Sequence, residues 1–405
     1  MYKKEECPDS VINEVITYLL ENSFFSEEEI YFANNDWSMV DAKNTSENSL
    51  LVLNCDEREL NKNKALLLDL SESLQKFAIV LIPDLKPENH KKYFSSKGGF
   101  YGRIPSVLYS SKKDRSLYIG GYLASYKKKS KSNLKVCAII STYNEEDIIE
   151  QVCMDFINQG IYIHAIDNWS TDRTFPILKR LEKETDMVDL EIFPENPTLD
   201  FNWEKILQRK EEISYEGEYD WYIHTDADEI RESPWETSLL EGIQFVDSLG
   251  FNSINFTVLD FRPIKDSFCR NIDPVDFFQY FELGERPGHF LQEKAWKHIK
   301  GSRVNLVDSG GHVVSFEGKK VFPFKFLLRH YPLRSLAQMD KKIYKDRLSR
   351  FELEKKTRGW HSQYDKYIGE KEISLWNQKE LLEFNKLSSG KYLLERLFTV
   401  NIERE

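Results

Sequence analysis

The sequence predicts an α/β protein built on a mostly parallel sheet that helices flank on both sides. Three observations support this prediction. After residue 133, short apolar runs and amphipathic stretches alternate four times. The first apolar run is nearly continuous, as in strands that are buried on both faces. Polar clusters follow three of the four runs, and sheets of this kind bind ligands beyond the carboxyl ends of their strands.

Length and composition limit the possible functions. The chain has 405 residues, 40% of them hydrophobic, which is enough for two or three domains. A net charge of −11 argues against a nucleic-acid partner. Five cysteines without C-x-x-C spacing suit a reducing compartment. Because we find no signal-peptide core and no apolar run that could span a bilayer, we expect a cytoplasmic protein. Peripheral contact with the inner membrane face stays open.

Residues 1–125 are expected to form a smaller α/β accessory domain. Apolar runs at 49–54 and 77–82 predict buried strands, and the helical pattern at 59–75 between them predicts a β-α-β unit. Residues 11–21 indicate a further helix. No glycine-rich phosphate loop is recognisable in this region, which favours an accessory role.

Two further stretches lead up to the main domain. Residues 101–122 predict short strands joined by turns. Residues 126–133 (YKKKSKSN) are basic and poor in apolar side chains, which is typical of a linker. A polybasic membrane contact is the alternative for this stretch.

The main domain is expected to span residues 134–350. Its first strand is the apolar run at 134–141, and a helix at 147–158 follows the polar loop TYNEE. The further elements predicted in this half are strands at 161–166, 188–193 and 221–225 and helices at 175–184 and 201–214.

Polar side chains lie just after three of these strands. Because the carboxyl ends of parallel strands share one edge of a sheet, these side chains are candidates for ligand binding. They are Thr142, Asn144, Glu145, Asp167, Asp172 and Asp226. Asp226 and Asp228 are two residues apart, so both point to one side if the chain is still extended there. Paired carboxylates repel each other unless a cation lies between them, and a divalent ion would meet that need.

Three stretches resemble the signatures of family 2 glycosyltransferases of the GT-A fold. They are STYNEED (141–147), IDNWSTDRT (166–174) and HTDADE (224–229). The likeness is good over residues 134–260, weaker to residue 350 and absent before 130. Where the family has a pair of acids, this chain has Asp167 and Asn168, and Trp169 stands where a small residue is usual.

The resemblance implies a nucleoside-diphosphate sugar as donor, a glycan or lipid-linked molecule as acceptor, and inversion at the anomeric carbon. In that case Asp167 would hold the base and Asp172 would support its loop. Asp226 and Asp228 would reach the ribose and a metal ion. Oxygen ligands favour Mn²⁺ or Mg²⁺ over zinc, and such an ion can stabilise the charge of the leaving diphosphate.

The acceptor side is expected in the second half of the domain. Residues 251–261 predict a strand that joins the sheet as an antiparallel addition. The irregular stretch at 262–301 then suits an acceptor site. An inverting enzyme needs a carboxylate base, and the family's usual acidic motif is not recognisable here. Asp260 is the first candidate and Asp266 the second, with three further acids at 273, 276 and 285.

Two histidines follow as candidate metal ligands. His330 comes after an apolar stretch and precedes a helix, and His312 follows two glycines. The alternative for either is a hydrogen-bonded structural histidine.

A basic helix and a C-terminal extension complete the expected architecture. A capping box at Ser335 opens a predicted helix that runs to about residue 357. Arg334 and Lys341 are candidates for contact with the donor diphosphate, and a solvated basic face is the alternative. Residues 351–405 are expected to form a helical extension, with helical patterns at 373–385 and 392–398.

Two other classes of function fit parts of the pattern. A non-catalytic carbohydrate-binding or scaffold protein would account for Asn168 and the unassigned base. A nucleotidyltransferase also uses paired carboxylates on an α/β sheet, but it would want a glycine-rich basic loop after the first strand, where TYNEED is acidic.

Overall fold

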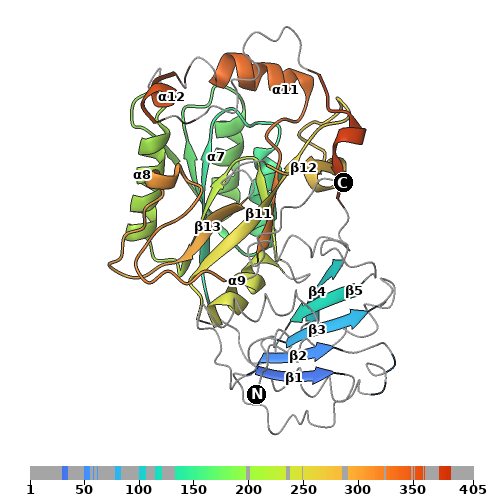
Figure 1. The fold of residues 1–405 in the computed structure, drawn as a ribbon. Helices are drawn as coiled ribbons and strands as arrows, with labels where there is room; N and C mark the ends of the chain where they lie inside the picture. The colour runs from blue at the N-terminus through green and yellow to red at the C-terminus, as the bar shows by residue number, and fades with distance from the viewer. Residues whose placement is uncertain are drawn as a thin grey trace.

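A computed structural model gives the fold of the chain (Figure 1). It describes residues 133–197, 201–233, 238–248, 250–284, 291–322, 325–347, 350, 352–358, 360 and 374–384, preceded by positions 58 and 62 and five strands between residues 30 and 120. The predicted helices at 11–21 and 392–398, and nearly all of the helix at 59–75 and of the linker at 126–133, lie outside the described residues. Among the helices of the described residues, none combines the length and apolarity that crossing a bilayer requires.

The larger sheet has ten strands. They are β6 (Val136–Thr142), β7 (Tyr162–Asp167), β8 (Val188–Ile192), β9 (Trp221–Asp226), β10 (Glu229–Glu232), β11 (Ser253–Phe261), β12 (Tyr280–Glu282), β13 (Leu291–Lys297), β14 (Phe326–His330) and β15 (Leu382–Glu383). Along the main path their order is β10-β14-β11-β13-β9-β6-β7-β8, and β12 joins β11 to β15 beside it. The four predicted strands that follow the linker are confirmed, and β6 pairs in parallel with both β7 and β9.

The strand predicted at 251–261 is confirmed as β11, and it joins the sheet through antiparallel pairing with β13. Its direction relative to β6 and β9 is parallel, which the prediction did not include. β13 runs antiparallel to β9, and β11 runs antiparallel to β13. Two reversals restore the original direction, and β14 then pairs in parallel with β11. As a result β6, β7, β9, β11 and β14 all end at one edge of the sheet. The residues after these strands are brought to that edge, as expected of ligand-binding α/β sheets.

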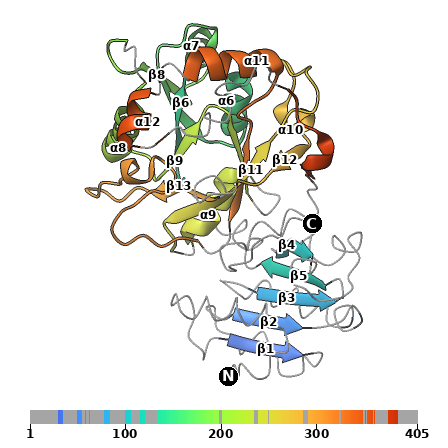
Figure 2. The ribbon, with the colours of Figure 1, turned by 45° about the horizontal axis from the view of Figure 1, so that its top comes forward.

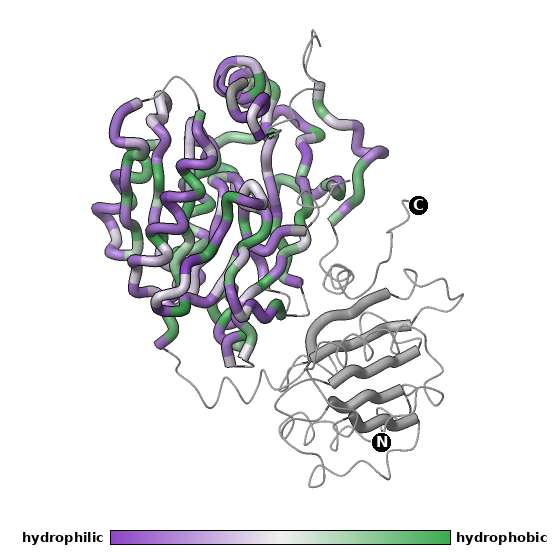
Figure 3. Tube along the Cα trace, turned by 60° about the vertical axis from the view of Figure 1, so that its left-hand side comes forward, coloured by the Kyte–Doolittle hydropathy of each residue, from purple (hydrophilic) through white to green (hydrophobic). Residues whose placement is uncertain are grey.

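Helices cover both faces of the larger sheet. On one face lie α6 (Ile149–Asn158), α7 (Thr174–Glu184) and α9 (Leu239–Ser248), and on the other lies α8 (Trp203–Glu216). The described residues also form α10 (Pro274–Phe277), α11 (Leu336–Asp340) and α12 (Glu352–Arg358). Hydrophobic and hydrophilic segments alternate along the larger helices, as they do in amphipathic helices (Figure 3). α11 lies at the end of the domain opposite α9 (Figures 1 and 2).

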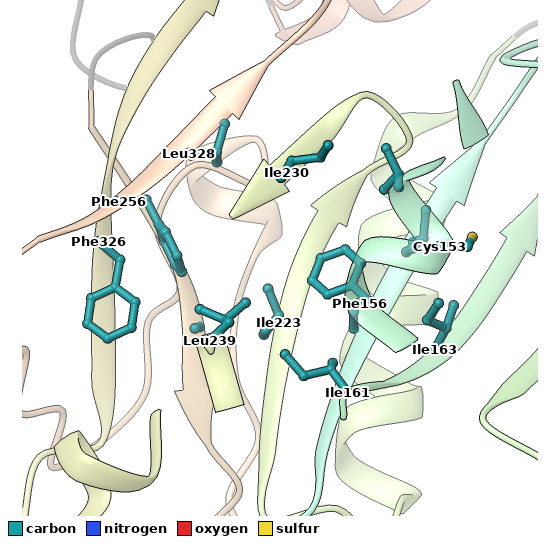
Figure 4. Packing of buried hydrophobic residues seen from close by; sticks show 14 of the residues in the cluster. Cys153, Phe156, Ile161, Ile163, Ile223, Ile230, Leu239, Phe256, Phe326 and Leu328 are labelled. Atoms are coloured by element: carbon teal, nitrogen blue, oxygen red, sulfur yellow. The ribbon is translucent and has the colours of Figure 1, made fainter. Parts of the chain in front are cut away.

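Apolar side chains pack on both faces of the larger sheet because side chains alternate across each strand. On one face, Ala138 and Ile140 of β6 pack in the cluster that contains residues of α6, α7 and α9. Phe156 and Cys153 of α6 lie in this cluster near Ile163 of β7 (Figure 4). On the other face, the neighbouring residues of β6 pack in a cluster with Leu207 of α8.

The smaller sheet contains β1 (Ile30–Asn34), β2 (Leu50–Asn54), β3 (Ala78–Pro83), β4 (Phe100–Pro105) and β5 (Arg115–Gly120). Its order is β1-β2-β3-β5-β4. The strands predicted at 49–54 and 77–82 are confirmed, and their parallel pairing is the one that a β-α-β unit requires. The predicted strands at 101–122 are confirmed as an antiparallel pair. The domain boundaries themselves stay predictions.

The helix predicted from Ser335 to about residue 357 is confirmed at its start and wrong in its continuity. Ser335 Oγ accepts a hydrogen bond from Gln338 N at 3.2 Å, as the capping box predicts. α11 ends at Asp340, a π-helix takes over at Lys341–Arg347, and α12 begins at Glu352. A π-helix inside a helical stretch is uncommon and often occurs at functional sites.

The helix predicted at 373–385 is wrong for the residues that the structure describes there. Residues 374–384 contain a 3₁₀ helix at Gln378–Glu380 and the short strand β15. Asn377 accepts a hydrogen bond from Lys379 N at 3.1 Å, and such local bonds compete with helix formation. β15 is held by pairing with β12.

Candidate active site

Three acidic side chains lie between the end of β9 and the start of β10: Asp226, Asp228 and Glu229. Burying carboxylates is costly unless they are paired. Lys294 of β13 lies 3.3 Å from Asp226 and 2.8 Å from Glu229, and Arg231 lies 2.7 Å from Glu229. Burial opposes the charge on Asp226, but the neighbouring basic groups, with Lys294 the strongest, together outweigh it and lower the pKa of that carboxyl to about 2. Asp226 is therefore ionised, and a ligand can reach it because 35% of its side chain is exposed.

Asp228 has a different set of partners. Lys342 of the π-helix donates a hydrogen bond to its Oδ2 at 2.8 Å, and Arg334 Nη1 lies 3.8 Å from the same oxygen. The other oxygen, Oδ1, lies 3.7 Å from His330 Nε2. Cations thus hold one side of this carboxylate, while an imidazole faces the other side.

The π-helix positions two cations on Glu145 of the TYNEE loop. Lys342 lies 2.9 Å and Arg347 3.6 Å from Glu145 Oε1. These two residues are five apart, and the i to i+5 hydrogen bonding of a π-helix brings such residues onto one side. Burial opposes the charge on Glu145, but Lys342 and Arg334 outweigh it and lower its pKa to about 2. The change of helix type at Lys341 thus coincides with the contacts of both cations with Glu145.

Arg334 and Lys341, the two predicted diphosphate contacts, lie in different environments. The Arg334 side chain is fully buried and binds both oxygens of Asp147 at 2.9 and 2.7 Å. It also donates to Glu145 and to the carbonyl of Tyr331. Lys341 is 39% exposed and lies 3.3 Å from Asp172. Arg334 therefore joins the TYNEED loop to the segment after β14. Lys342, which the sequence analysis did not single out, contacts Asp228 and Glu145.

His330 and Asp260 are neighbours across β14 and β11. Their Cα atoms are partners in the parallel register, and His330 Nδ1 lies 2.6 Å from Asp260 Oδ1. Burial opposes a charge on His330, but Asp228 and Asp260 outweigh it and raise the pKa of the imidazole. The structure thus brings the first base candidate and one metal-ligand candidate together beside Asp228.

Asp266 and His312 take other positions. Asp266 Oδ1 accepts a hydrogen bond from Leu336 N at 2.8 Å, at the start of α11. His312 lies after Gly310 and Gly311, and its Nδ1 is 3.4 Å from Gln292 Nε2 at the start of β13. The catalytic role of Asp266 and the metal role of His312 stay predictions.

Two buried oxygens at the ends of β6 and β7 have no hydrogen-bond partner among the described residues. They are Thr142 Oγ1 and Asp167 Oδ1, and the two residues are partners in the β6–β7 register. The other oxygen of Asp167 accepts from Ser170 N at 2.9 Å. Burial raises the pKa of Asp167, and the hydrogen bonds from Ser170 oppose this. Buried polar atoms are normally paired, so a polar ligand between these strand ends would satisfy both oxygens.

The loops around this pair are held in unusual conformations. Asn144 and Trp169 are the non-glycine residues of the described chain with positive φ, at 56° and 60°. Asn144 Oδ1 accepts from Thr171 N at 2.8 Å, which joins the loop after β6 to the loop after β7. Trp169 Nε1 donates to Pro194 O at 2.8 Å while 36% of the residue stays exposed. Such strained positions cluster at ligand sites, where the surrounding structure maintains them.

Asn168, the residue that departs from the family pattern, has a structural use. Its Nδ2 donates to Phe193 O at 2.9 Å, and its Oδ1 accepts from Arg350 Nη2 at 2.9 Å. The Arg350 guanidinium lies 3.9 Å from the centre of the Tyr143 ring. An amide can donate and accept at once, whereas a carboxylate could only accept here. The Asn168 amide therefore holds Arg350 beside the loop after β6.

Asp172 lies at the base of the same loop. Its Oδ1 accepts from Thr174 N at 2.8 Å at the start of α7, and its Oδ2 lies 3.5 Å from Glu146 N. These contacts join the ends of the two loops, which suits the supporting role implied for Asp172.

The donor atoms at Asp228 and His330 suit a hard divalent cation. Neighbouring ligands of an octahedral ion with bonds near 2.1 Å lie roughly 3 Å apart, and Asp228 Oδ1 is 3.7 Å from His330 Nε2. Within the described residues, no group of three or more His, Cys, Asp or Glu side chains is arranged as a ligand set. Asp226, the third expected ligand, faces Lys294 instead. The residues fit a cation held by two protein groups with Asp226 close by.

The chain shows only partial similarity to known proteins. No family model matches it, and no curated protein matches it in sequence. Solved structures similar to part of it include glucosyl-3-phosphoglycerate synthase from Mycobacterium tuberculosis in complex with Mn²⁺, uridine diphosphate and phosphoglyceric acid. That match has 19% identity and a TM-score of 0.20, and covers 27% of this chain and 37% of the other.

Two further structures show a comparable likeness. A mannosyltransferase from Pyrobaculum calidifontis in complex with GDP-mannose and Mn²⁺ is 18% identical, with a TM-score of 0.23 over 35% of this chain and 42% of the other. A 4-diphosphocytidyl-2C-methyl-D-erythritol synthase from Anaerococcus prevotii is 11% identical, with a TM-score of 0.24 over 41% of this chain and 72% of the other. Likenesses at this level carry no argument, so the case for a function rests on the residues of the site.

Proposed function

We propose that this chain is a glycosyltransferase that moves a sugar from a nucleoside-diphosphate sugar to a glycan or lipid-linked acceptor. The main support is the pair of unpartnered buried oxygens, Thr142 Oγ1 and Asp167 Oδ1. They lie at the edge of the sheet where Asp226 and Asp228 also lie. An acceptor oxygen in a confined site suits the imide N–H of uracil or the N–H groups of guanine. The base of the donor would therefore bind between the ends of β6 and β7.

The charges of the site support a diphosphate next to the base. Lys342 and Arg347 converge on Glu145 from the π-helix, and Arg and Lys bind phosphate oxygens well. A divalent cation at Asp228 and His330, with Asp226 beside it, would supply Lewis-acid stabilisation of the leaving diphosphate. The protein residues bind the donor, orient its phosphates and fix the anomeric carbon relative to the acceptor side at β11 and β12. Mn²⁺ and Mg²⁺ both suit this donor set.

The proposal is tested by ligand-induced stabilisation of the full-length chain. A panel of UDP- and GDP-sugars is added with and without MnCl₂, and thermal unfolding is measured. A donor at 100 times its Kd stabilises the folded state by about 2.7 kcal/mol, which raises Tm by roughly 5–10 °C for a domain of 150–250 residues. Asp167→Asn should abolish this shift, because its amide can present a donor to the base in place of an acceptor. Asp189→Asn is the matched control, since Asp189 is an exposed carboxylate on the neighbouring strand β8.

No shift with any nucleotide sugar would refute the proposal and favour the scaffold protein. A shift with nucleoside triphosphates in place of nucleotide sugars would favour a nucleotidyltransferase.

A further inference from the structure

Asp260 and His330 form a contact that strand pairing fixes. β11 and β14 run parallel, and Asp260 and His330 are the last residues paired in that register. Both side chains project from the sheet at the same level, and Asp260 Oδ1 lies 2.6 Å from His330 Nδ1. On the far side of β14, His330 is paired with Glu229 of β10. Because strands on both sides hold the backbone of His330, its ring orientation depends mainly on the hydrogen bond from Nδ1.

This contact determines which ring nitrogen is available to a ligand. An ionised carboxylate has no proton to donate, so Nδ1 must carry the hydrogen that joins the two groups. In the neutral imidazole, Nε2 then has the free lone pair. His330 Nε2 is the nitrogen that faces Asp228 Oδ1, at 3.7 Å. Two electron-pair donors that face each other at this distance form a suitable pair of ligands for a cation.

Asp260 itself is fixed on its other side. Its Oδ2 lies 3.5 Å from Arg262 Nη2, and Arg262 donates to Glu282 at 2.7 and 2.9 Å. The Arg262 guanidinium also lies 5.2 Å from the centre of the Trp376 ring. Only 12% of the Asp260 side chain is exposed. Protein groups therefore engage both oxygens of Asp260, which suits an orienting group better than a base that must reach an acceptor hydroxyl.

We propose that Asp260 is a positioning residue that fixes the tautomer and ring orientation of His330, so that Nε2 completes a divalent-cation site with Asp228. The inference rests on the proposed function, which places a cation at these two residues. Carboxylates that orient metal-binding histidines commonly affect metal affinity by about 10–100-fold. Asp260 would then act on the cation through His330, and the acceptor base would come from another carboxylate.

The test is a titration of the full-length protein with Mn²⁺ alone, followed by the electron paramagnetic resonance signal of free Mn²⁺. Asp260→Ala should weaken Mn²⁺ binding by about 10–100-fold. Asp260→Asn keeps an acceptor oxygen and a similar shape, so its affinity should lie between those of Asp260→Ala and the wild type. Asp189→Ala is the matched control: it removes an exposed carboxylate from β8, which lies at the other end of the strand order from β11 and β14.

A second measurement reads the orientation without any metal. Long-range ¹H–¹⁵N correlation spectra of protein labelled at histidine report which ring nitrogen of His330 carries the proton. Loss of the Nδ1–H form in Asp260→Ala is the expected result, with no change in Asp189→Ala.

The outcomes separate this inference from the proposed function. If wild-type protein binds Mn²⁺ and Asp260→Ala binds it equally well, the positioning role is refuted while the glycosyltransferase proposal stands. Wild-type protein that binds nucleotide sugar but no Mn²⁺ refutes the metal site and the positioning role together.

Discussion

Replacing Lys342 by methionine should strengthen metal binding and weaken nucleotide binding at the same site. Lys342 Nζ lies 2.8 Å from Asp228 Oδ2 and 2.9 Å from Glu145 Oε1. A divalent ion on the other oxygen of Asp228 would lie about 4–5 Å from this ammonium group. Two unit charges 4 Å apart interact by about 1 kcal/mol even in water, so the ion would experience roughly 2 kcal/mol of repulsion. Removing the lysine charge should therefore tighten Mn²⁺ binding by at least about tenfold.

The same substitution should destabilise the metal-free protein. Removing one partner of a buried ion pair costs about 3–5 kcal/mol, and we expect the lower end because Arg334 also contacts Glu145 and lies near Asp228. Urea unfolding without metal measures this loss. The affinity for uridine or guanosine diphosphate in saturating Mn²⁺ should fall, because a phosphate contact is lost.

Lys345→Met is the matched control for Lys342→Met. Lys345 lies in the same π-helix, but its side chain is 70% exposed and pairs with Asp340 at 3.1 Å. The control should leave Mn²⁺ affinity unchanged. Unchanged or weaker Mn²⁺ binding in Lys342→Met would refute the idea that lysine and cation share the carboxylate of Asp228.

Three further perturbations test other parts of the site. Arg334→Lys should lower the free energy of unfolding by about 3 kcal/mol, because lysine cannot reproduce the bidentate contact with Asp147; urea unfolding with an unchanged m-value checks this. Glu145 has a lowered pKa, so its contribution to stability is present above its unfolded-state pKa near 4.5 and is lost as pH falls toward about 2; wild type should lose more stability between pH 5 and pH 3 than Glu145→Gln. His330→Ala should weaken Mn²⁺ binding more than His312→Ala, and the reverse order in a titration would make His312 the ligand.

Local patterns allowed much of the fold to be predicted. The four strands after the linker, the helices between them and the capping box at Ser335 all follow from apolar periodicity and end signals, which act over a few residues. The rule that strands of a parallel sheet share one carboxyl edge then placed Thr142, Asp167 and Asp226 near each other. Those residues lie there in the structure.

Long-range pairing could not be predicted in the same way. The direction of β11 depends on the insertion of β13 between β11 and β9, and no feature within residues 251–261 indicates that neighbour. Helical periodicity also does not predict the π-helix at Lys341, where Lys342 and Arg347 contact Glu145 of a loop that is distant in sequence.

The positive partners of Asp226 and Asp228 could not be identified from the sequence. The sequence predicts that Asp226 and Asp228 need a positive partner, and it points to a metal ion. The structure supplies lysines instead: Lys294 and Lys342 follow these acids by 68 and 114 residues. A lysine beside an acid does not exclude a cation, because each carboxylate has a second oxygen and Asp228 turns that oxygen toward His330. The lysines hold the carboxylates in place, so a cation or a diphosphate would enter a site whose charges are already arranged.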